Sequence, residues 1–174
     1  MSTINEVALE IFNALYYIFP AYCANGAPVV FGGGHPIDRG KKFWDGRPIF
    51  GSHKTIRGFA SGIIIGTFVG WVQEALAPNV GLPQGSLTLG FALSLGALIG
   101  DLIGSFIKRR LNLKPGESLP LSDQLDFVLV ALLFGLLVSP PSPTAALIMI
   151  ILTGPVHLLV NAIAYLLRLK KTPW

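Results

Sequence analysis

Apolar residues fill long stretches of the chain and leave few polar positions inside them. Residues 75–100 are 26 positions without a charged side chain, and residues 127–167 are 41. A hydrocarbon core about 30 Å thick takes roughly 20 helical residues to cross. Both stretches exceed that length, so the pattern predicts an all-α polytopic membrane protein.

Five membrane-spanning helices are predicted from the apolar segments and the breaks between them. The run 139–143 has three prolines in five residues and separates the last two helices, because proline cannot continue a helix. The predicted spans are Val7–Phe31, Gly58–Ala77, Ser86–Ile107, Leu121–Val138 and Thr144–Leu167. They form a helix bundle that is a single membrane domain, residues 1–174, with cytoplasmic loops at about 32–57 and 108–122.

The distribution of basic residues predicts the orientation. All 13 lysines and arginines lie in the first loop (39–57), the third loop (108–114) or the C-terminal tail (168–171). The positive-inside rule places these segments in the cytoplasm, and therefore the C-terminus inside and the N-terminus outside. We therefore expect a multi-pass protein of the cell membrane.

Composition narrows the possible partners. Hydrophobic residues make up 52% of the chain and charged residues 13%, which is about half the charged share of a soluble domain. Such a chain is neither disordered nor a soluble nucleic-acid binder, so membrane lipids are expected as partners and nucleic acid is not. The single cysteine, Cys23, excludes a disulfide scaffold.

Glycine recurs at every fourth position in two predicted helices. Small residues with this spacing let helix backbones approach closely. The stripes could form a homodimer face or pack inside one bundle. We favour the bundle, because two stripes in one chain can pack against each other. They are Gly58, Gly62, Gly66 and Gly70 in the second helix, and Gly96, Gly100 and Gly104 in the third.

Ionisable side chains at membrane depth indicate function, because they are expensive there. Asp101, Ser105 and Lys108 share one face of the third helix at 3.6 residues per turn. An acid, a hydroxyl and a cation thus line up toward the cytoplasmic end. The structural alternative is an internal Asp101–Lys108 ion pair, with Arg109 and Arg110 as ordinary membrane-interface anchors.

Two further carboxylates lie at the start of the predicted fourth helix. Asp123 and Asp126 are three residues apart and so lie on neighbouring positions of one face. Capping of the helix start explains Ser122 or Asp123, but it explains Asp126 less well. Together with Asp101, these carboxylates could hold Mg²⁺, which prefers oxygen ligands.

The first loop combines glycines with lysines and arginines. Glycines let backbone amides approach an anion, and the basic side chains add charge. Lys54 and Thr55 place a cation and a hydroxyl at the start of the second helix. The loop could bind a phosphate group, or it could be a basic segment that touches anionic lipid.

Polar residues also occur within the first and last helices. Pro20, Asn25 and Pro28 are expected to interrupt the first helix, so Asn25 could read a polar head or a nucleobase, or bond to freed carbonyls. His157 and Asn161, four residues apart, could line a cavity or form an interhelical hydrogen bond.

The chain resembles the archaeal CDP-archaeol synthases. The resemblance rests on residues 20–28, on Pro36-Ile-Asp38-x-Gly40-Lys41, and on Asp45-Gly46-Arg47-x-x-x-Gly51-x-x-Lys54-Thr55-x-Arg57-Gly58. Gly100-Asp101-x-x-x-Ser105-x-x-Lys108-Arg109 and Asp123-x-x-Asp126 are similar to the signature of integral-membrane CTP transferases. That group includes the phosphatidate cytidylyltransferases.

The resemblance implies a Mg²⁺-dependent cytidylyltransferase. Such an enzyme transfers CMP from CTP to 2,3-bis-O-(geranylgeranyl)-sn-glycerol 1-phosphate, an unsaturated diether glycerol phosphate, and releases pyrophosphate. We expect its active site to face the cytoplasm. The expected metal ligands are Asp101, Asp123 and Asp126. The expected catalytic residues are Asp101, Lys108 and Arg109, and the expected nucleotide-binding residues are Asn25, Lys41, Lys54, Thr55, Arg57 and Ser105.

Two other functions stay open at this point. A transporter or channel would use Asp101 and His157 to line its pathway and would move a solute without consuming nucleotide. A lipid kinase would use ATP in place of CTP. Only the enzymes account for a glycine-rich, strongly basic loop.

Overall fold

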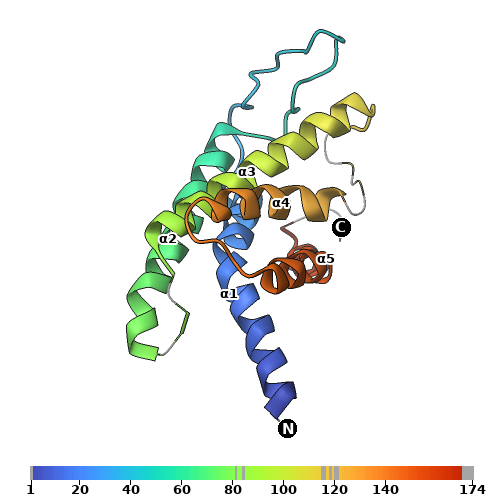
Figure 1. Ribbon diagram of the computed structural model, residues 1–174. Helices are drawn as coiled ribbons and strands as arrows, with labels where there is room; N and C mark the ends of the chain where they lie inside the picture. The colour runs from blue at the N-terminus through green and yellow to red at the C-terminus, as the bar shows by residue number, and fades with distance from the viewer. Residues whose placement is uncertain are drawn as a thin grey trace.

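The computed structural model describes residues 2–80, 82–83, 85–114, 117, 119 and 122–169. Leu121, Lys170 and Lys171, which belong to the predicted fourth span and tail, lie outside these residues. Five helices follow one another, as predicted, and within the described ranges extended pairing is limited to two isolated bridges in the first loop. The helices are α1 (Ser2–Phe31), α2 (Ile56–Val80), α3 (Leu87–Arg110), α4 (Ser122–Leu136) and α5 (Pro143–Leu166) (Figure 1).

The first helix is continuous, and the interruption expected at its prolines is wrong. α1 runs through both Pro20 and Pro28 without a break. Proline lacks an N–H, so Pro20 leaves the carbonyl of Tyr16, one turn earlier, without its helical donor. Gln73 of α2 supplies the missing donor, with Nε2 2.6 Å from the Tyr16 oxygen. A neighbouring helix thus satisfies the freed group within the apolar interior.

The glycine stripe of α2 packs inside the bundle, as favoured from the sequence. A Cβ atom at Gly62 would lie 2.7 Å from the Ala24 carbonyl oxygen of α1, and one at Gly66 would lie 2.7 Å from that of Pro20. Gly70 faces α3, where its Cβ would meet the backbone of Gly90. The stripe therefore lies in the groove between α1 and α3, and each missing side chain allows backbone contact.

The glycine stripe of α3 packs against α4. A Cβ atom at Gly96 would lie 2.7 Å from the Ala131 Cα of α4, and one at Gly104 would overlap the carboxylate of Asp126. The two stripes do not pack against each other along their length, because α3 turns this second face toward α4. The close α3–α4 approach brings Asp126 directly onto α3.

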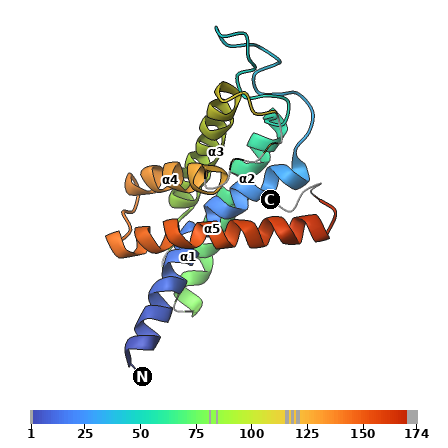
Figure 2. The same ribbon diagram turned by 90° about the vertical axis from the view of Figure 1, so that its right-hand side faces the viewer.

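The buried core lies where α1, α3, α4 and α5 meet. Ile18, Leu93, Phe127, Val128 and Met149 are almost fully inaccessible to solvent there. α5 lies across α1 at a steep angle, and its C-terminal end is beside the C-terminal end of α1 (Figure 2). The polar ends of several helices are thereby brought around one space.

Four of the described helices are long and apolar enough to cross a membrane: α1, α2, α3 and α5. α4 has 15 residues, which gives it a length of about 22 Å, less than the thickness of a typical hydrocarbon core. The fold thus fits a membrane helix bundle in which four of the described helices are long and apolar enough to cross and α4 is shorter.

Candidate active site

A cavity of about 630 Å³ lies between the first loop and helices α1, α3 and α5. Six of the predicted site residues line it: Asn25, Lys54, Asp101, Ser105, Lys108 and Arg109. The helical spacing of Asp101, Ser105 and Lys108 therefore predicted a shared face correctly. Asn25 reaches the same space from α1.

Lys54 and Asp101 form the central ion pair of the cavity. Lys54 Nζ lies 2.6 Å from each carboxylate oxygen of Asp101. Both side chains are about one quarter exposed, so ligands in the cavity can reach them. Thr55, the next residue, is buried instead, and its Oγ1 accepts a hydrogen bond from the Gly58 amide at 3.1 Å. Thr55 is thus the N-cap of α2 and holds Lys54 at the helix start.

A second acid–base pair lies at the cytoplasmic end of α3. Lys108 Nζ is 2.7 Å from Asp123 Oδ1, so the alternative pairing of Lys108 with Asp101 is wrong. Asp123 also accepts a hydrogen bond from the Leu119 amide, and Asp126 lies against Gly104. Among the described residues, no three Asp, Glu, His or Cys side chains form a ready cluster for a metal ion.

The donor set nevertheless suits a divalent cation. Lys54 of the first loop holds Asp101 of α3, Lys108 of α3 holds Asp123 of α4, and Asp126 of α4 lies against Gly104 of α3. These are oxygen ligands of the kind that Mg²⁺ prefers. Each lysine now neutralises a carboxylate that could instead bind a cation, so the carboxylates have the chemistry of Mg²⁺ ligands.

Arg109 is the most deeply buried charge in the cavity wall. Its side chain is 4% exposed. Nη2 donates to the Lys114 carbonyl at 3.1 Å, but Nε and Nη1 have no hydrogen-bond partner among the described residues. Buried donors without partners are rare and destabilising. Arg109 lines the cavity, and a guanidinium offers the planar, paired donors that suit a phosphate group.

Asp38 organises the first loop. Its carboxylate accepts hydrogen bonds from the amides of Gly40, Phe50 and Gly51, each at 2.9 Å. Burial alone would raise the pKa of Asp38, but these amide hydrogen bonds outweigh it and hold the pKa below its ordinary value. The loop is thereby folded so that Phe50 and Lys54 line the cavity.

Arg110 attaches the outer part of the loop to α3. Its guanidinium lies 3.1 Å from Asp45 Oδ2 and 2.5 Å from the Pro48 carbonyl, and it stacks over the rings of Phe43 and Phe106. Cation–π and charge-assisted contacts of this kind reinforce each other. Arg110 thus has a structural role next to Arg109, which faces the cavity.

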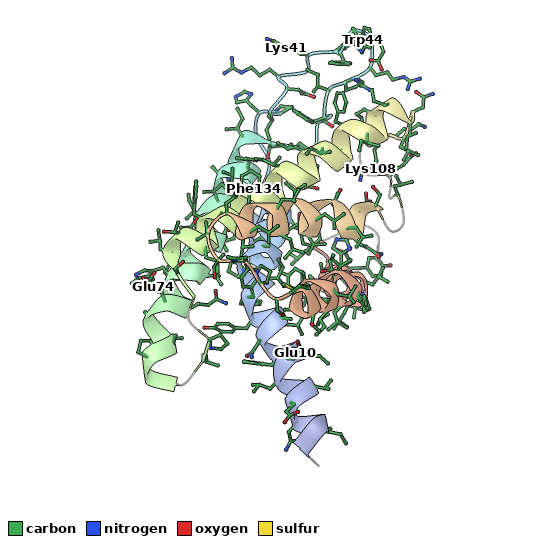
Figure 3. The ribbon with its side chains drawn as sticks, in the orientation of Figure 1. Glu10, Lys41, Trp44, Glu74, Lys108 and Phe134 are labelled. Carbon is green, nitrogen blue, oxygen red and sulfur yellow. The ribbon has the colours of Figure 1, made fainter. Side chains whose placement is uncertain are left out.

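Five of the predicted site residues do not line the cavity: Lys41, Thr55, Arg57, Asp123 and Asp126. Lys41 is exposed in the outer part of the loop, as is Trp44, and both are far from Lys108 (Figure 3). Arg57 is exposed on the first turn of α2 and is not part of the cavity wall. The structure therefore gathers the predicted residues of α1 and α3, with Lys54, around the cavity, but not the two carboxylates of α4 or the outermost basic residues.

Comparison with known proteins identifies the family. The family described as CarS-like CDP-archaeol synthase matches residues 7–174. The chain belongs to this family. The CDP-archaeol synthase of Pyrococcus abyssi is 49% identical over 168 residues, which cover 94% of this chain and 98% of the relative. That of Methanocaldococcus jannaschii is 46% identical over 172 residues, with 94% and 97% covered.

A solved structure agrees with the fold. It is of an intramembrane enzyme for archaeal membrane lipid biosynthesis and superimposes with a TM-score of 0.77 at 38% identity, covering 87% of this chain and 94% of the other. The chain is thus an enzyme, a CTP-dependent cytidylyltransferase of the CDP-archaeol synthase family.

In this CDP-archaeol synthase family member, the cavity wall also includes polar and aromatic residues of α1, α4 and α5. His157 and Asn161 line the cavity, which was one of the two roles considered for them. They hydrogen-bond to each other at 3.2 Å, but this bond lies within α5 and does not join two helices. Tyr22, whose hydroxyl is 2.9 Å from Thr153 Oγ1, and Phe127 complete an aromatic wall. Thr153, His157 and Asn161 recur every four residues, a spacing that could have indicated one shared face of α5.

Proposed function

We propose that the chain transfers CMP from CTP to 2,3-bis-O-(geranylgeranyl)-sn-glycerol 1-phosphate and releases pyrophosphate, with Mg²⁺ bound. The observation that carries this proposal is Arg109, buried in the cavity wall with two donors unused among the described residues. A phosphate group would satisfy those donors. Family membership supports the choice of CTP and of an archaeol-type lipid phosphate.

The proposed topology has five spans, with the N-terminus outside and the C-terminus in the cytoplasm. Its support is the confinement of all 13 basic residues to alternate connections. α4 would cross as a short helix, since a short apolar segment is accommodated by local thinning of the bilayer. The cavity would then open toward the cytoplasm, where CTP is found.

The reaction needs no nucleophilic side chain. An oxygen of the lipid phosphate attacks the α-phosphorus of CTP, and the bond from that phosphorus to the bridging oxygen of the β-phosphate breaks. Pyrophosphate leaves with the electron pair of that bond. Because two anions must meet, the main task of the protein is to neutralise charge and to position both substrates.

Residues of the cavity wall and of the adjoining α3–α4 contact divide this task. Asp101, Asp123 and Asp126 would hold Mg²⁺, which when bound supplies positive charge to the nucleotide phosphates. Lys54 and Lys108 are then freed from their carboxylate partners and donate to phosphate oxygens. Arg109, the most buried of these cations, binds a phosphate group. Ser105 and Asn25 line the same cavity and can form hydrogen bonds to the substrates.

Pyrophosphate release tests the proposal. Detergent-purified protein would receive Mg²⁺, a diether glycerol phosphate, and CTP, ATP, GTP or UTP in turn. We expect release with CTP that depends on both lipid and metal. Preference for ATP with transfer of the γ-phosphate would indicate a lipid kinase. Solute flux across sealed vesicles, without nucleotide consumption, would indicate the transporter, which the family comparison does not favour.

A further inference from the structure

A second cavity, of about 510 Å³, lies between α1 and α2 in the half of the molecule away from the first loop. One face of the N-terminal half of α1 and one face of the C-terminal half of α2 form its walls. Among the described residues, it shares none with the active-site cavity. We call it the α1–α2 groove, and its main apolar walls are Phe12, Leu15 and Phe19 of α1 and Phe68, Val72 and Leu76 of α2.

The path of the glycine stripe along α2 explains why the groove exists. At Gly66, α2 is in backbone contact with α1, since a Cβ atom there would lie 2.7 Å from the Pro20 carbonyl oxygen. One turn further along α2, Gly70 faces Gly90 of α3 instead. The close-packing face of α2 thus turns from α1 to α3. Beyond Gly66, the space between α1 and α2 is bordered by aromatic and aliphatic side chains.

The groove opens between two helices that are apolar enough to cross a membrane. Three of its aromatic side chains are about half exposed: Phe12 at 46%, Phe19 at 50% and Phe68 at 56%. Side chains that line a cavity and are also half exposed mark its mouth. Because α1 and α2 border this mouth on both sides, it faces the hydrocarbon of the bilayer. Apolar walls without partner atoms lose dispersion contacts, so the groove is suited to an apolar ligand.

The groove offers little to a polar ligand. Tyr16 and Gln73 are the polar side chains among its described lining residues, and none of those residues is charged. Gln73 is 6% exposed, and its Nε2 donates a hydrogen bond to the Tyr16 carbonyl at 2.6 Å. The ligand that matches these walls is a hydrocarbon chain.

The volume of the groove distinguishes a lipid chain from a helix of a second copy. Phe12 and Phe19 are seven positions apart, so the groove runs along about 10 Å of α1. A helix about 10–12 Å across would need roughly 1,000 Å³ over that length. This is about twice the 510 Å³ of the groove. A branched hydrocarbon chain is thinner than a helix and fits within the space.

The charges around the groove select the head group of the lipid. α1 and α2 carry their carboxylates in the half that forms the groove, at Glu6, Glu10 and Glu74, and their one cation, Arg57, at the other end. Figure 3 shows Glu10 and Glu74 well away from Lys41 in the first loop. An anionic head group would be repelled by these carboxylates. It would find no cation, because every lysine and arginine lies in the first loop, the third loop or the tail.

We propose that the α1–α2 groove binds a hydrocarbon chain of an uncharged membrane lipid, at a site separate from the active site. The bound chain fills the gap that begins beyond Gly66, and so it stabilises the diverging halves of α1 and α2. The proposal does not depend on the proposed function, because no substrate of the cytidylyltransferase takes part.

Lipid binding to the purified full chain tests the proposal. The probe is an uncharged diether glycerol lipid with branched chains, and the comparison is a lipid with the same chains and an anionic phosphoglycerol head group. Native mass spectrometry should show one uncharged lipid per chain and at least about threefold weaker binding of the anionic lipid. A concentration of uncharged lipid one hundred times its Kd should raise the melting temperature by about 5 °C.

A matched pair of tryptophan variants on α2 locates the lipid. Val72→Trp would fill the middle of the groove. Ile64→Trp places the same ring two turns away, where Ile64 is 67% exposed and lies outside the described lining of both cavities. Val72→Trp should weaken binding of the uncharged lipid at least about tenfold, and Ile64→Trp should stay within about threefold of wild type. If Val72→Trp does not fold, Leu76→Trp blocks the same groove nearer the end of α2, with the same expected loss.

Three results would overturn the proposal. Equal binding of the uncharged lipid by folded Val72→Trp and Ile64→Trp proteins would place the lipid elsewhere. Equal or tighter binding of the anionic lipid would show that the carboxylates do not select the head group. A dimer in sedimentation that excludes the lipid and is disrupted by Val72→Trp would make the groove an interface between two copies of the chain.

Discussion

Lys54 Nζ binds both carboxylate oxygens of Asp101 at 2.6 Å, although the two residues are 47 positions apart. The pair joins the basic loop to the acidic face of α3, so anion-binding and cation-binding groups neutralise each other in the absence of ligands. The same arrangement recurs at Lys108 and Asp123. A site of this kind holds charges in place for substrates that carry both a metal and phosphates.

Asp101→Asn should abolish turnover and leave the protein folded. Removing a group that stabilises charge in the transition state costs about 10²–10³ in kcat. The measurement is pyrophosphate release together with the melting temperature in detergent. Glu10→Gln, on the far part of α1 (Figure 3), is the matched control and should have wild-type activity. Full activity of the Asp101→Asn protein would exclude Asp101 from the site.

Arg109→Met should stabilise the ligand-free protein and inactivate it. The guanidinium is buried with two donors unused among the described residues, and replacing a buried, incompletely bonded charge by an apolar side chain is often stabilising by about 1–4 kcal/mol. For a chain of this size, 1 kcal/mol corresponds to a shift of roughly 2–4 °C in the melting temperature. Thermal unfolding with and without CTP measures both effects.

The Arg109 prediction has a clear contrary outcome. Arg109→Lys keeps the charge but loses the planar pair of donors, so it should weaken CTP binding without the gain in stability. If Arg109→Met instead lowers the melting temperature of the ligand-free protein, the guanidinium is a structural group whose donors are satisfied, and it is not a phosphate-binding group.

Arg110→Ala should loosen the first loop. The change removes the ion pair to Asp45, the hydrogen bond to Pro48 and the stacking on two rings. We expect kcat/KM for CTP to fall about tenfold, as for misplacement of a binding group. A double-mutant cycle with Asp45→Asn should give a coupling energy of about 0.5–3 kcal/mol. Lys42→Ala, an exposed change in the same loop, serves as the control.

Asp38 should make the loop sensitive to acid only at low pH. Its pKa is held below the ordinary value, which is about 3.9, so the unfolded loop binds a proton more readily than the folded one. The stabilisation of the folded loop is therefore complete above that ordinary value and is lost as the pH falls through the lowered pKa.

Trypsin cleavage after Lys41 or Lys42 at neutral pH should be faster in Asp38→Ala, and Asp38→Asn should be intermediate. Unchanged cleavage in Asp38→Ala would mean that the amide hydrogen bonds do not hold the loop.

Gly70→Ala should destabilise the bundle more than Gly26→Ala. A Cβ at position 70 would meet the backbone of Gly90, whereas one at position 26 has open space around it. Overpacking against backbone costs about 1–3 kcal/mol or more, while Gly to Ala in an open helical position is stabilising by roughly 0.5–1 kcal/mol. Thermal unfolding of the two variants in the same detergent checks the difference. Equal melting temperatures would exclude close α2–α3 contact at this glycine.

The sequence by itself determined the helices, the membrane class and the close packing of glycine faces. Helix length, apolar continuity and a four-residue glycine spacing are local properties, so they can be read along one chain. The same periodicity placed Asp101, Ser105 and Lys108 on one face, which the cavity confirms.

Only the tertiary structure decided how the charges pair and which of them face the cavity. Lys54 binds Asp101 and Lys108 binds Asp123, Arg109 faces the cavity while its neighbour Arg110 secures the loop, and Lys41 lies outside. Pro20 stays within a helix because Gln73, 57 residues away from Tyr16, supplies a donor. These outcomes depend on the rotation and crossing of helices that are distant in sequence, and no local pattern specifies those.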